Sequence, residues 1–168
     1  MSTSTGPNRS GDGFIPPAWL DGREAAAWRG FIDMRAALMA RLGRELQRQS
    51  GLSEADYSVL VELSEAEGRR LRLGGLGRGL GWEKSRVSRQ VARMQARGLV
   101  EREDCLTDGR GAFAVLTPKG LDTVERAAPL HVGQVRRWFV EALSPEQLEA
   151  MAGIADAVIR RLHEQEVD

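Results

Sequence analysis

The sequence predicts a mostly helical protein with one small β-hairpin after its middle. Apolar residues recur at helical spacing over long stretches near both ends, and Ser, Thr or Asp caps precede these stretches. Two short runs of alternating character also flank an Asp-Gly turn, which is typical of a hairpin. The predicted order is therefore helix, helix, strand, helix, helix, strand, strand, helix, helix.

The predicted elements follow from their caps and turns. Asp21, Ser53, Thr117 and Ser144 are the expected helix caps, and Gly98 is the expected stop of the fourth helix. The predicted helices are 21–49, 53–66, 74–81, 83–97, 117–139 and 144–162, and the predicted strands are 71–73, 99–104 and 112–116.

The chain is predicted to have four parts. Residues 1–13 are rich in Gly, Ser, Thr and Asn without apolar periodicity, so we expect a disordered tail. Residues 14–50 form an arm and a long helix, 51–117 a compact lobe, and 118–168 two further helices. Because long amphipathic ends around a compact centre are hard to bury within one chain, we expect them to pair with a second copy.

Composition places the chain among soluble globular proteins, with 42% hydrophobic and 29% charged residues. No apolar run approaches the length of a membrane span, and the N-terminus lacks the basic and apolar regions of a signal peptide. We therefore expect a cytoplasmic protein without a membrane partner. The one cysteine cannot form an internal disulfide, which fits a reducing compartment.

Formal charges cancel over the whole chain, but basic residues gather in its middle. The segment 69–110 holds eleven Lys or Arg and five Asp or Glu, a net charge of +6, which leaves −6 for the rest of the chain. This distribution predicts a local site for a polyanion on a neutral scaffold.

The helix predicted at 83–97 has two distinct faces. Val87, Val91 and Met94 lie within about 60° of one another on a helical wheel, so we expect this face to pack inward. The other side carries hydroxyl and guanidinium groups, which suit base edges and phosphates in the major groove of DNA. The predicted DNA contacts of this helix are Lys84, Ser85, Arg86, Ser88, Arg89 and Arg93. The alternative is a solvated, arginine-rich surface helix.

The hairpin that follows favours DNA binding. A helix of this kind, then a strand, an Asp-Gly-Arg-Gly tip and a returning strand, is the winged helix-turn-helix arrangement. Asp108 and Arg110 are the predicted wing contacts, with Arg110 reaching a minor groove, although an exposed turn arginine is the alternative. The predicted fold class is mostly α with a small β-wing: a winged helix-turn-helix with N- and C-terminal dimerisation helices.

The sequence resembles the MarR family of bacterial regulators. The resemblance rests on 82–103 (WEKSRVSRQVARMQARGLVERE), on the wing at 107–111 (TDGRG) and on 116–120 (LTPKG). It implies a triangular dimer in which the first, fifth and sixth helices pair the subunits and two wings flank double-stranded DNA. It also implies groove contacts by Ser85, Arg86, Ser88 and Arg89, and an aspartate at 108 that buttresses an arginine.

Two features depart from the family pattern. The usual Asp-Arg-Arg of the wing is here Asp108-Gly109-Arg110, so one expected arginine is missing and the tip should be more mobile. The helix before the reading helix has five glycines between 74 and 81. Because each costs roughly 1 kcal/mol relative to alanine, this helix should depend on the packing of Leu76 and Leu80.

Other residues have competing interpretations. Trp19 and Trp28 are core or dimer-interface residues, or they line a pocket for a small aromatic effector. Cys105 is a plain strand residue or a redox sensor. His131 and His163 lack any clustered ligands, so we expect solvated histidines, no metal and no other cofactor.

Together these features predict a homodimeric, sequence-specific DNA-binding transcriptional regulator and not an enzyme. We expect a repressor of a pseudo-palindromic operator, with half-sites about one helical turn apart and with release by a small-molecule effector as an option. The alternative is a protein-interaction module that uses the winged-helix surface without specific DNA binding.

Overall fold

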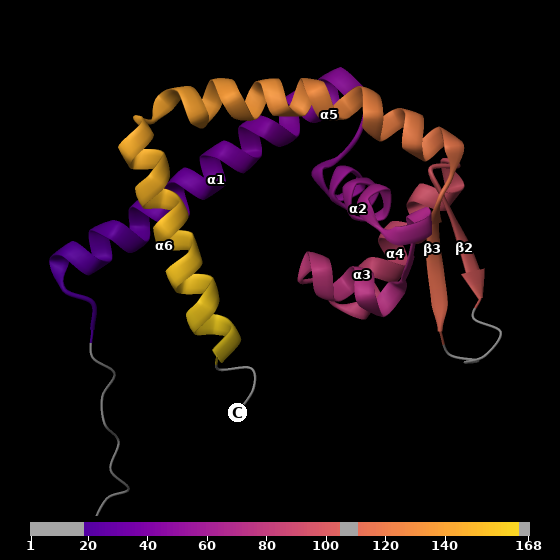
Figure 1. The fold of residues 1–168 in the computed structure, drawn as a ribbon, viewed down its shortest axis with the longest axis horizontal. Coiled ribbons are helices and arrows are strands. Elements are labelled where there is room, and N and C mark those ends of the chain that lie inside the picture. The colour runs from indigo at the N-terminus through magenta and orange to yellow at the C-terminus, as the bar shows by residue number, and fades with distance from the viewer. Residues whose placement is uncertain (1–18, 105–110, 165–168) are drawn as a thin grey trace, which may run out of the picture. The chain divides into compact units, whose positions relative to one another are not determined.

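A computed structural model describes residues 19–104 and 111–164 of the chain. These residues form six α-helices, two one-turn 3-10 helices and three strands, in the order that the sequence predicts (Figure 1). The helices are α1 (Gly22–Ser50), α2 (Glu54–Glu65), α3 (Leu73–Leu80), α4 (Lys84–Ala96), α5 (Pro118–Trp138) and α6 (Pro145–Glu164), and the strands are β1 (Arg70–Arg72), β2 (Val100–Asp104) and β3 (Ala112–Leu116). The predictions made for residues 1–13 lie outside the described residues.

The chain divides into two compact units, Met1–Arg35 and Ala36–Asp168, and α1 crosses the boundary between them. The four functional parts expected from the sequence remain a prediction. In the first unit, Asp21 and Glu24 form the predicted capping box. Asp21 Oδ1 accepts from the Glu24 amide at 2.8 Å, and Glu24 Oε2 accepts from the Asp21 amide at 2.9 Å.

Side-chain caps also open three helices of the second unit. Ser53 Oγ accepts from the Asp56 amide at 3.1 Å, and Asp56 Oδ2 accepts from the Ser53 amide at 3.0 Å. Thr117 Oγ1 accepts from the Gly120 amide at 2.9 Å, and Ser144 Oγ accepts from the Gln147 amide at 3.3 Å. The predicted starts of α2, α5 and α6 are therefore confirmed.

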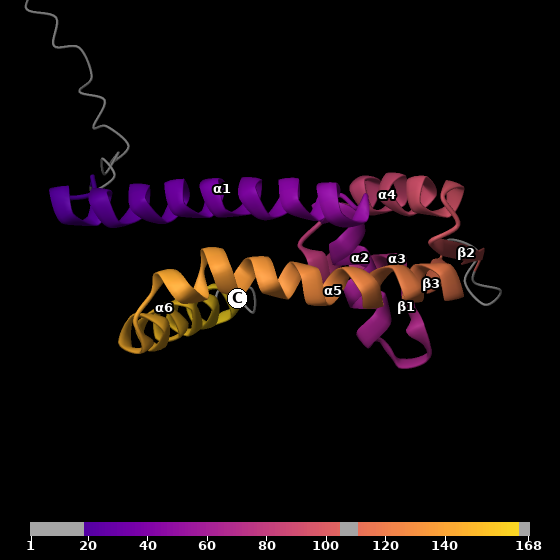
Figure 2. The ribbon, with the colours of Figure 1, turned by 90° about the horizontal axis from the view of Figure 1, so that it is seen from above.

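The core of the second unit lies where α2, α3, α4 and the sheet meet, and Figures 1 and 2 both show these elements gathered together. Val87, Val91 and Met94 of α4 are buried in this cluster, so the predicted inward face is confirmed. Leu76 of α3 is fully buried and Leu80 packs against the cluster, as the glycine-rich composition of α3 requires.

The sheet has the strand order β1-β3-β2 and is antiparallel throughout. β3 is central, and its alternating residues Ala112, Ala114 and Leu116 face the core. β1 lies one residue before its predicted position because Leu73 is already the first residue of α3.

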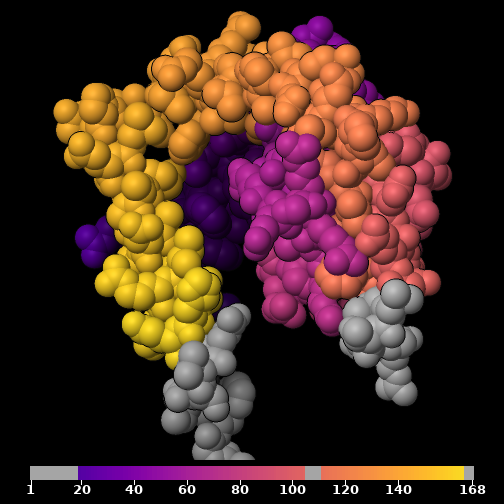
Figure 3. Space-filling view, turned by 45° about the vertical axis from the view of Figure 1, so that its right-hand side comes forward, coloured from indigo at the N-terminus to yellow at the C-terminus, as the bar shows by residue number. Residues whose placement is uncertain are grey.

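Gly120 at the start of α5 explains how this helix can pass so close to the sheet. A Cβ on Gly120 would lie 2.0 Å from the carbonyl oxygen of Leu99, so any side chain would force the two elements apart. The C-terminal helix α6 behaves differently, because none of its twenty described residues is buried. Figure 3 shows α6 (yellow) standing clear of the lobe that α2, α3 and α4 form.

Candidate nucleic-acid interface

α4 brings the predicted DNA-contact residues together on its exposed side. Lys84, Ser85, Arg86, Arg89 and Arg93 are exposed, and Ser88 is half-buried. Glu83 precedes the helix without making a side-chain cap, so the first-turn amides of α4 have no capping carboxylate. The start of α4 can therefore accept an anion such as a phosphate.

An open groove of about 900 Å³ lies between the start of α4, α3 and the sheet. Of the described residues, Arg72, Arg78, Lys84 and Arg102 line it together with one acidic residue, Glu83. Four cations against one carboxylate make this groove attractive to a polyanion. From the sequence, Arg72, Arg78 and Arg102 are predicted only as part of a basic segment, because the groove forms between elements that are distant in sequence.

Trp82 supports an arginine of this interface. The guanidinium carbon of Arg86 lies 4.1 Å from the centre of the Trp82 ring, within range of a cation–π interaction. Trp82 itself packs against the core. Gly77 allows this arrangement, since a Cβ there would lie 2.9 Å from the Trp82 carbonyl oxygen.

Arg70 and the groove residue Arg72 both lie against Phe113 on the sheet. The guanidinium carbons of Arg70 and Arg72 lie 3.7 and 5.3 Å from the centre of its ring, and Arg70 also pairs with Glu103 at 2.9 Å. Phe113 is opposite both Arg72 and Glu103 in the strand register. This cluster was not predicted, although the period-two spacing of Arg70 and Arg72 is a signal that could have indicated it.

A buried carboxylate connects α2 with α4. Asp56 is only 4% exposed, and its Oδ1 accepts from Gln90 Nε2 at 2.7 Å while its Oδ2 accepts from Arg97 Nη1 at 2.7 Å. Burial raises the pKa of Asp56, but hydrogen bonds from the Ser53 amide, Arg97 and the Ser53 hydroxyl outweigh it, so the pKa lies below its usual value. Neither Asp56 nor Gln90 is a site residue predicted from the sequence, because the two lie 34 residues apart and no local pattern links them.

Asp108, Arg110 and Cys105 lie outside the described residues, so the roles predicted for them stay predictions. The strands on either side are described, and β2 pairs with β3 from Val100↔Leu116 to Asp104↔Ala112. The hairpin that the sequence predicts is therefore confirmed.

Trp19 and Trp28 belong to the first unit and are 89% and 57% exposed. The Trp28 ring centre lies 6.0 Å from that of Phe31. Neither tryptophan is a core residue of the single chain, so that part of the interpretation is wrong. Their roles at a dimer interface or in an effector pocket stay predictions.

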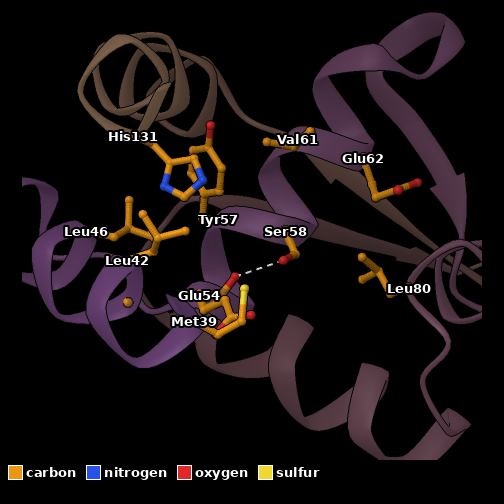
Figure 4. A pocket seen from close by; sticks show the side chains of 11 residues that line it. Met39, Leu42, Leu46, Glu54, Tyr57, Ser58, Val61, Glu62, Leu80 and His131 are labelled. Atoms are coloured by element: carbon orange, nitrogen blue, oxygen red, sulfur yellow. Dashed lines mark hydrogen bonds between the residues drawn. The ribbon is translucent and has the colours of Figure 1, made fainter. Parts of the chain in front are cut away.

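The second unit holds a separate cavity of about 270 Å³ between α1, α2 and α5 (Figure 4). His131 lies over Tyr57, with 4.6 Å between the ring centres, and the Nδ1 atom of His131 is buried without a hydrogen-bond partner. Burial lowers the pKa of His131, although the charge of Glu54 raises it. The expectation of a solvated His131 is therefore wrong, because α5 turns this residue toward α2.

A surface helix with a buried apolar face, an exposed basic face and an adjoining antiparallel hairpin defines a winged helix-turn-helix lobe. In the described residues no helix is long and apolar enough to span a bilayer, and no group of three or more His, Cys, Asp or Glu side chains is placed to hold a metal ion.

Comparisons with known proteins identify the family. The MarR family model matches residues 50–111. AbsC, a MarR family transcriptional regulator from Streptomyces coelicolor, is 40% identical, with 88% of this chain and 99% of that chain covered and a TM-score of 0.81. Sco3205 from the same organism, solved in complex with DNA, is also 40% identical, with 87% and 92% covered and a TM-score of 0.81. The transcriptional repressor MprA of Escherichia coli K12 is 26% identical over 137 residues, covering 82% of this chain and 77% of MprA.

The chain therefore belongs to the MarR family of transcriptional regulators. Its function is DNA-binding regulation of transcription.

Proposed function

We propose that this protein is a homodimeric repressor that binds a pseudo-palindromic site in double-stranded DNA through the exposed face of α4. The observation that carries the proposal is the two-sided character of α4, whose apolar side is locked into the core while its hydroxyl and guanidinium side faces outward beside a basic groove. The DNA complex of Sco3205 and the repressor activity named for MprA support it.

The proposed contacts divide by chemistry. Ser85 and Arg89 lie opposite the buried face of α4 and read base edges, since a guanidinium can bond guanine through two hydrogen bonds. The groove cations Arg72, Arg78 and Arg102 hold the phosphate backbone, which fixes register without reading sequence. Asp108 and Arg110 of the wing add a contact outside the major groove.

The dimer is proposed from apolar side chains that the chain leaves uncovered. In the first unit, large apolar residues of α1 are exposed, and in the second unit α5 and α6 expose more. These residues are Trp28, Phe31, Ile32 and Met34 of α1, Leu130, Val132 and Trp138 of α5, and Ile154, Val158, Ile159 and Leu162 of α6. Exposed apolar area of this extent is typical of a surface that another subunit covers.

Genomic fragment selection tests the proposal. The protein should enrich fragments with two related half-sites, and Arg89→Ala should lower the ratio of specific to non-specific affinity by roughly five- to hundredfold. Arg126→Ala is the matched control, because Arg126 is an exposed arginine of α5. An unchanged ratio for Arg89→Ala would remove this residue from base reading. A wild-type protein that gives no salt-dependent specific shift would instead favour the protein-interaction module.

The wing contact has its own test. If Arg110 contacts a phosphate, Arg110→Ala should make the salt dependence of binding shallower by about one unit in the slope of log K against log salt. A slope equal to that of the wild type would count against the contact.

Release by a small molecule is the second part of the proposal, and the cavity beside His131 supports it. Glu54 and Glu62 line this cavity, together with apolar side chains and the Tyr57 ring, and no lysine or arginine is among the described residues that line it. An uncharged or cationic aromatic compound therefore fits better than an aromatic carboxylate. Aromatic amines should raise the melting temperature and weaken DNA binding, whereas a response to benzoates alone would contradict this ligand class.

We assign the protein no catalytic activity.

A further inference from the structure

We propose that Asp56 and Gln90 position the side chain of Arg93 for its contact with DNA. Together with Arg93 they form the relay, the hydrogen-bonded chain Asp56–Gln90–Arg93, which runs from the N-terminus of α2 to the exposed side of α4. The inference rests on the proposed DNA-binding function. Asp56 and Gln90 are positioning residues, since both are buried and only Arg93 is exposed.

The relay begins at a carboxylate that the fold holds firmly. Asp56 caps α2 with Ser53, and its Oδ2 accepts from both the Ser53 amide at 3.0 Å and Arg97 Nη1 at 2.7 Å. Arg97 is fixed in turn, because its Nη2 donates to the Gly51 carbonyl at 3.2 Å. The remaining oxygen, Oδ1, accepts from Gln90 at 2.7 Å.

The charge of Asp56 determines which way the Gln90 amide faces. A carboxylate can only accept hydrogen bonds, so Gln90 must direct its NH₂ group toward Asp56. The carbonyl oxygen Oε1 of Gln90 then points away, and Arg93 Nη2 donates to it. Because Gln90 is only 2% exposed, water does not readily replace either partner.

The consequence for Arg93 is a restricted side chain that still has donors for DNA. A guanidinium has five N–H donors, and the relay uses one Nη2 donor of Arg93. A free arginine would lose rotamer entropy when it binds a phosphate, and a tethered one has lost part of it already. Arg89, one turn earlier on α4, has no such tie to Gln90 among the contacts of the described residues and serves as the internal comparison.

A double-mutant cycle in DNA affinity, measured on the full chain with a selected genomic fragment, tests the relay. Gln90→Met keeps the length of the side chain and removes both polar ends. We expect it to weaken binding roughly fivefold in the wild-type background, to have no effect in an Arg93→Ala background, and to keep its full effect in an Arg89→Ala background.

Each other outcome overturns the relay. Equal losses in all three backgrounds would mean that Gln90→Met acts by distorting α4, and no loss in the wild-type background would mean that Arg93 needs no tether. If Gln90→Met does not fold by circular dichroism, Asp56→Asn provides the same cycle, since a neutral amide no longer fixes the direction of Gln90. If the wild-type protein itself shows no specific DNA binding, the proposed function fails together with the relay. That result differs from a failure of the relay alone, in which the wild type still binds specifically.

Discussion

α4 and α6 are both amphipathic helices, yet they place their apolar faces in opposite situations. Val87, Val91 and Met94 of α4 are at most 1% exposed, whereas Ile154 and Val158 of α6 are 60% and 55% exposed. The chain's own α2, α3 and sheet cover the apolar face of α4, whereas the apolar face of α6 is uncovered in the single chain and is the surface proposed for a second copy. The comparison teaches that periodicity predicts a buried face but not which molecule buries it.

The largest expected effect comes from α6. Ile154→Asp combined with Val158→Asp places two charges on the proposed subunit interface, so we expect monomers and a loss of specific DNA affinity of about a hundredfold or more. Sedimentation velocity distinguishes the mass of a monomer from that of a dimer. Arg160→Asp, on the opposite side of α6, is the control and should remain dimeric. A dimeric double variant would place the interface elsewhere.

Truncating an apolar side chain to alanine should affect folding when it lies in α4 and subunit association when it lies in α6. Met94→Ala leaves a cavity in the core and should lower the free energy of unfolding by about 2–5 kcal/mol without weakening subunit association. Ile159→Ala in α6 should instead raise the dimer dissociation constant. Urea unfolding and sedimentation equilibrium separate the two effects. The comparison fails if Met94→Ala weakens the dimer as strongly as Ile159→Ala does.

Glycines of α3 test how tightly α4 is held. Gly77→Ala should cost about 1–3 kcal/mol of stability, because its Cβ would lie 2.9 Å from the Trp82 carbonyl oxygen. Gly74→Ala meets only Arg78 Nη1, at 3.8 Å, and should stabilise α3 by up to about 1 kcal/mol. Thermal unfolding of the two variants measures both changes in stability. Equal changes would show that the close approach of α3 to Trp82 does not affect stability.

The last prediction concerns the stability of the fold at low pH. The pKa of Asp56 is lowered in the folded protein, so its ionised form stabilises the fold above the unfolded value of about 3.9, and this stability is lost as pH falls through the lowered pKa. Asp56→Asn should lose about 1–3 kcal/mol at pH 7 and decline less steeply below pH 4. Asp122→Asn, at an exposed ion pair on α5, is the control. Parallel stability curves for Asp56→Asn and the wild type would contradict the lowered pKa.

The sequence predicted the helices well because their signals are local. The helix caps Ser53, Thr117 and Ser144 each accept a hydrogen bond from an amide three residues later, so each predicts the start of a helix from a few neighbouring residues. The inward face of α4 is likewise predicted by the spacing of Val87, Val91 and Met94.

The long-range features escaped prediction because no local pattern encodes them. Asp56 bonds Gln90 and Arg97 across 34 and 41 residues, and a buried glutamine is unusual enough that Gln90 was not expected in the core. The burial of His131 is not predictable from local sequence, because its partner Tyr57 lies on another helix. The exposure of Trp19 and Trp28 likewise depends on what a single chain can cover.

Hydroxyl-radical footprinting on a selected genomic fragment tests the central claim most directly. A dimer joined through α6 that reads DNA with two copies of α4 should protect two patches, related by pseudo-twofold symmetry and centred about one helical turn apart. One protected patch, or none at protein concentrations that saturate the shift, would contradict the account.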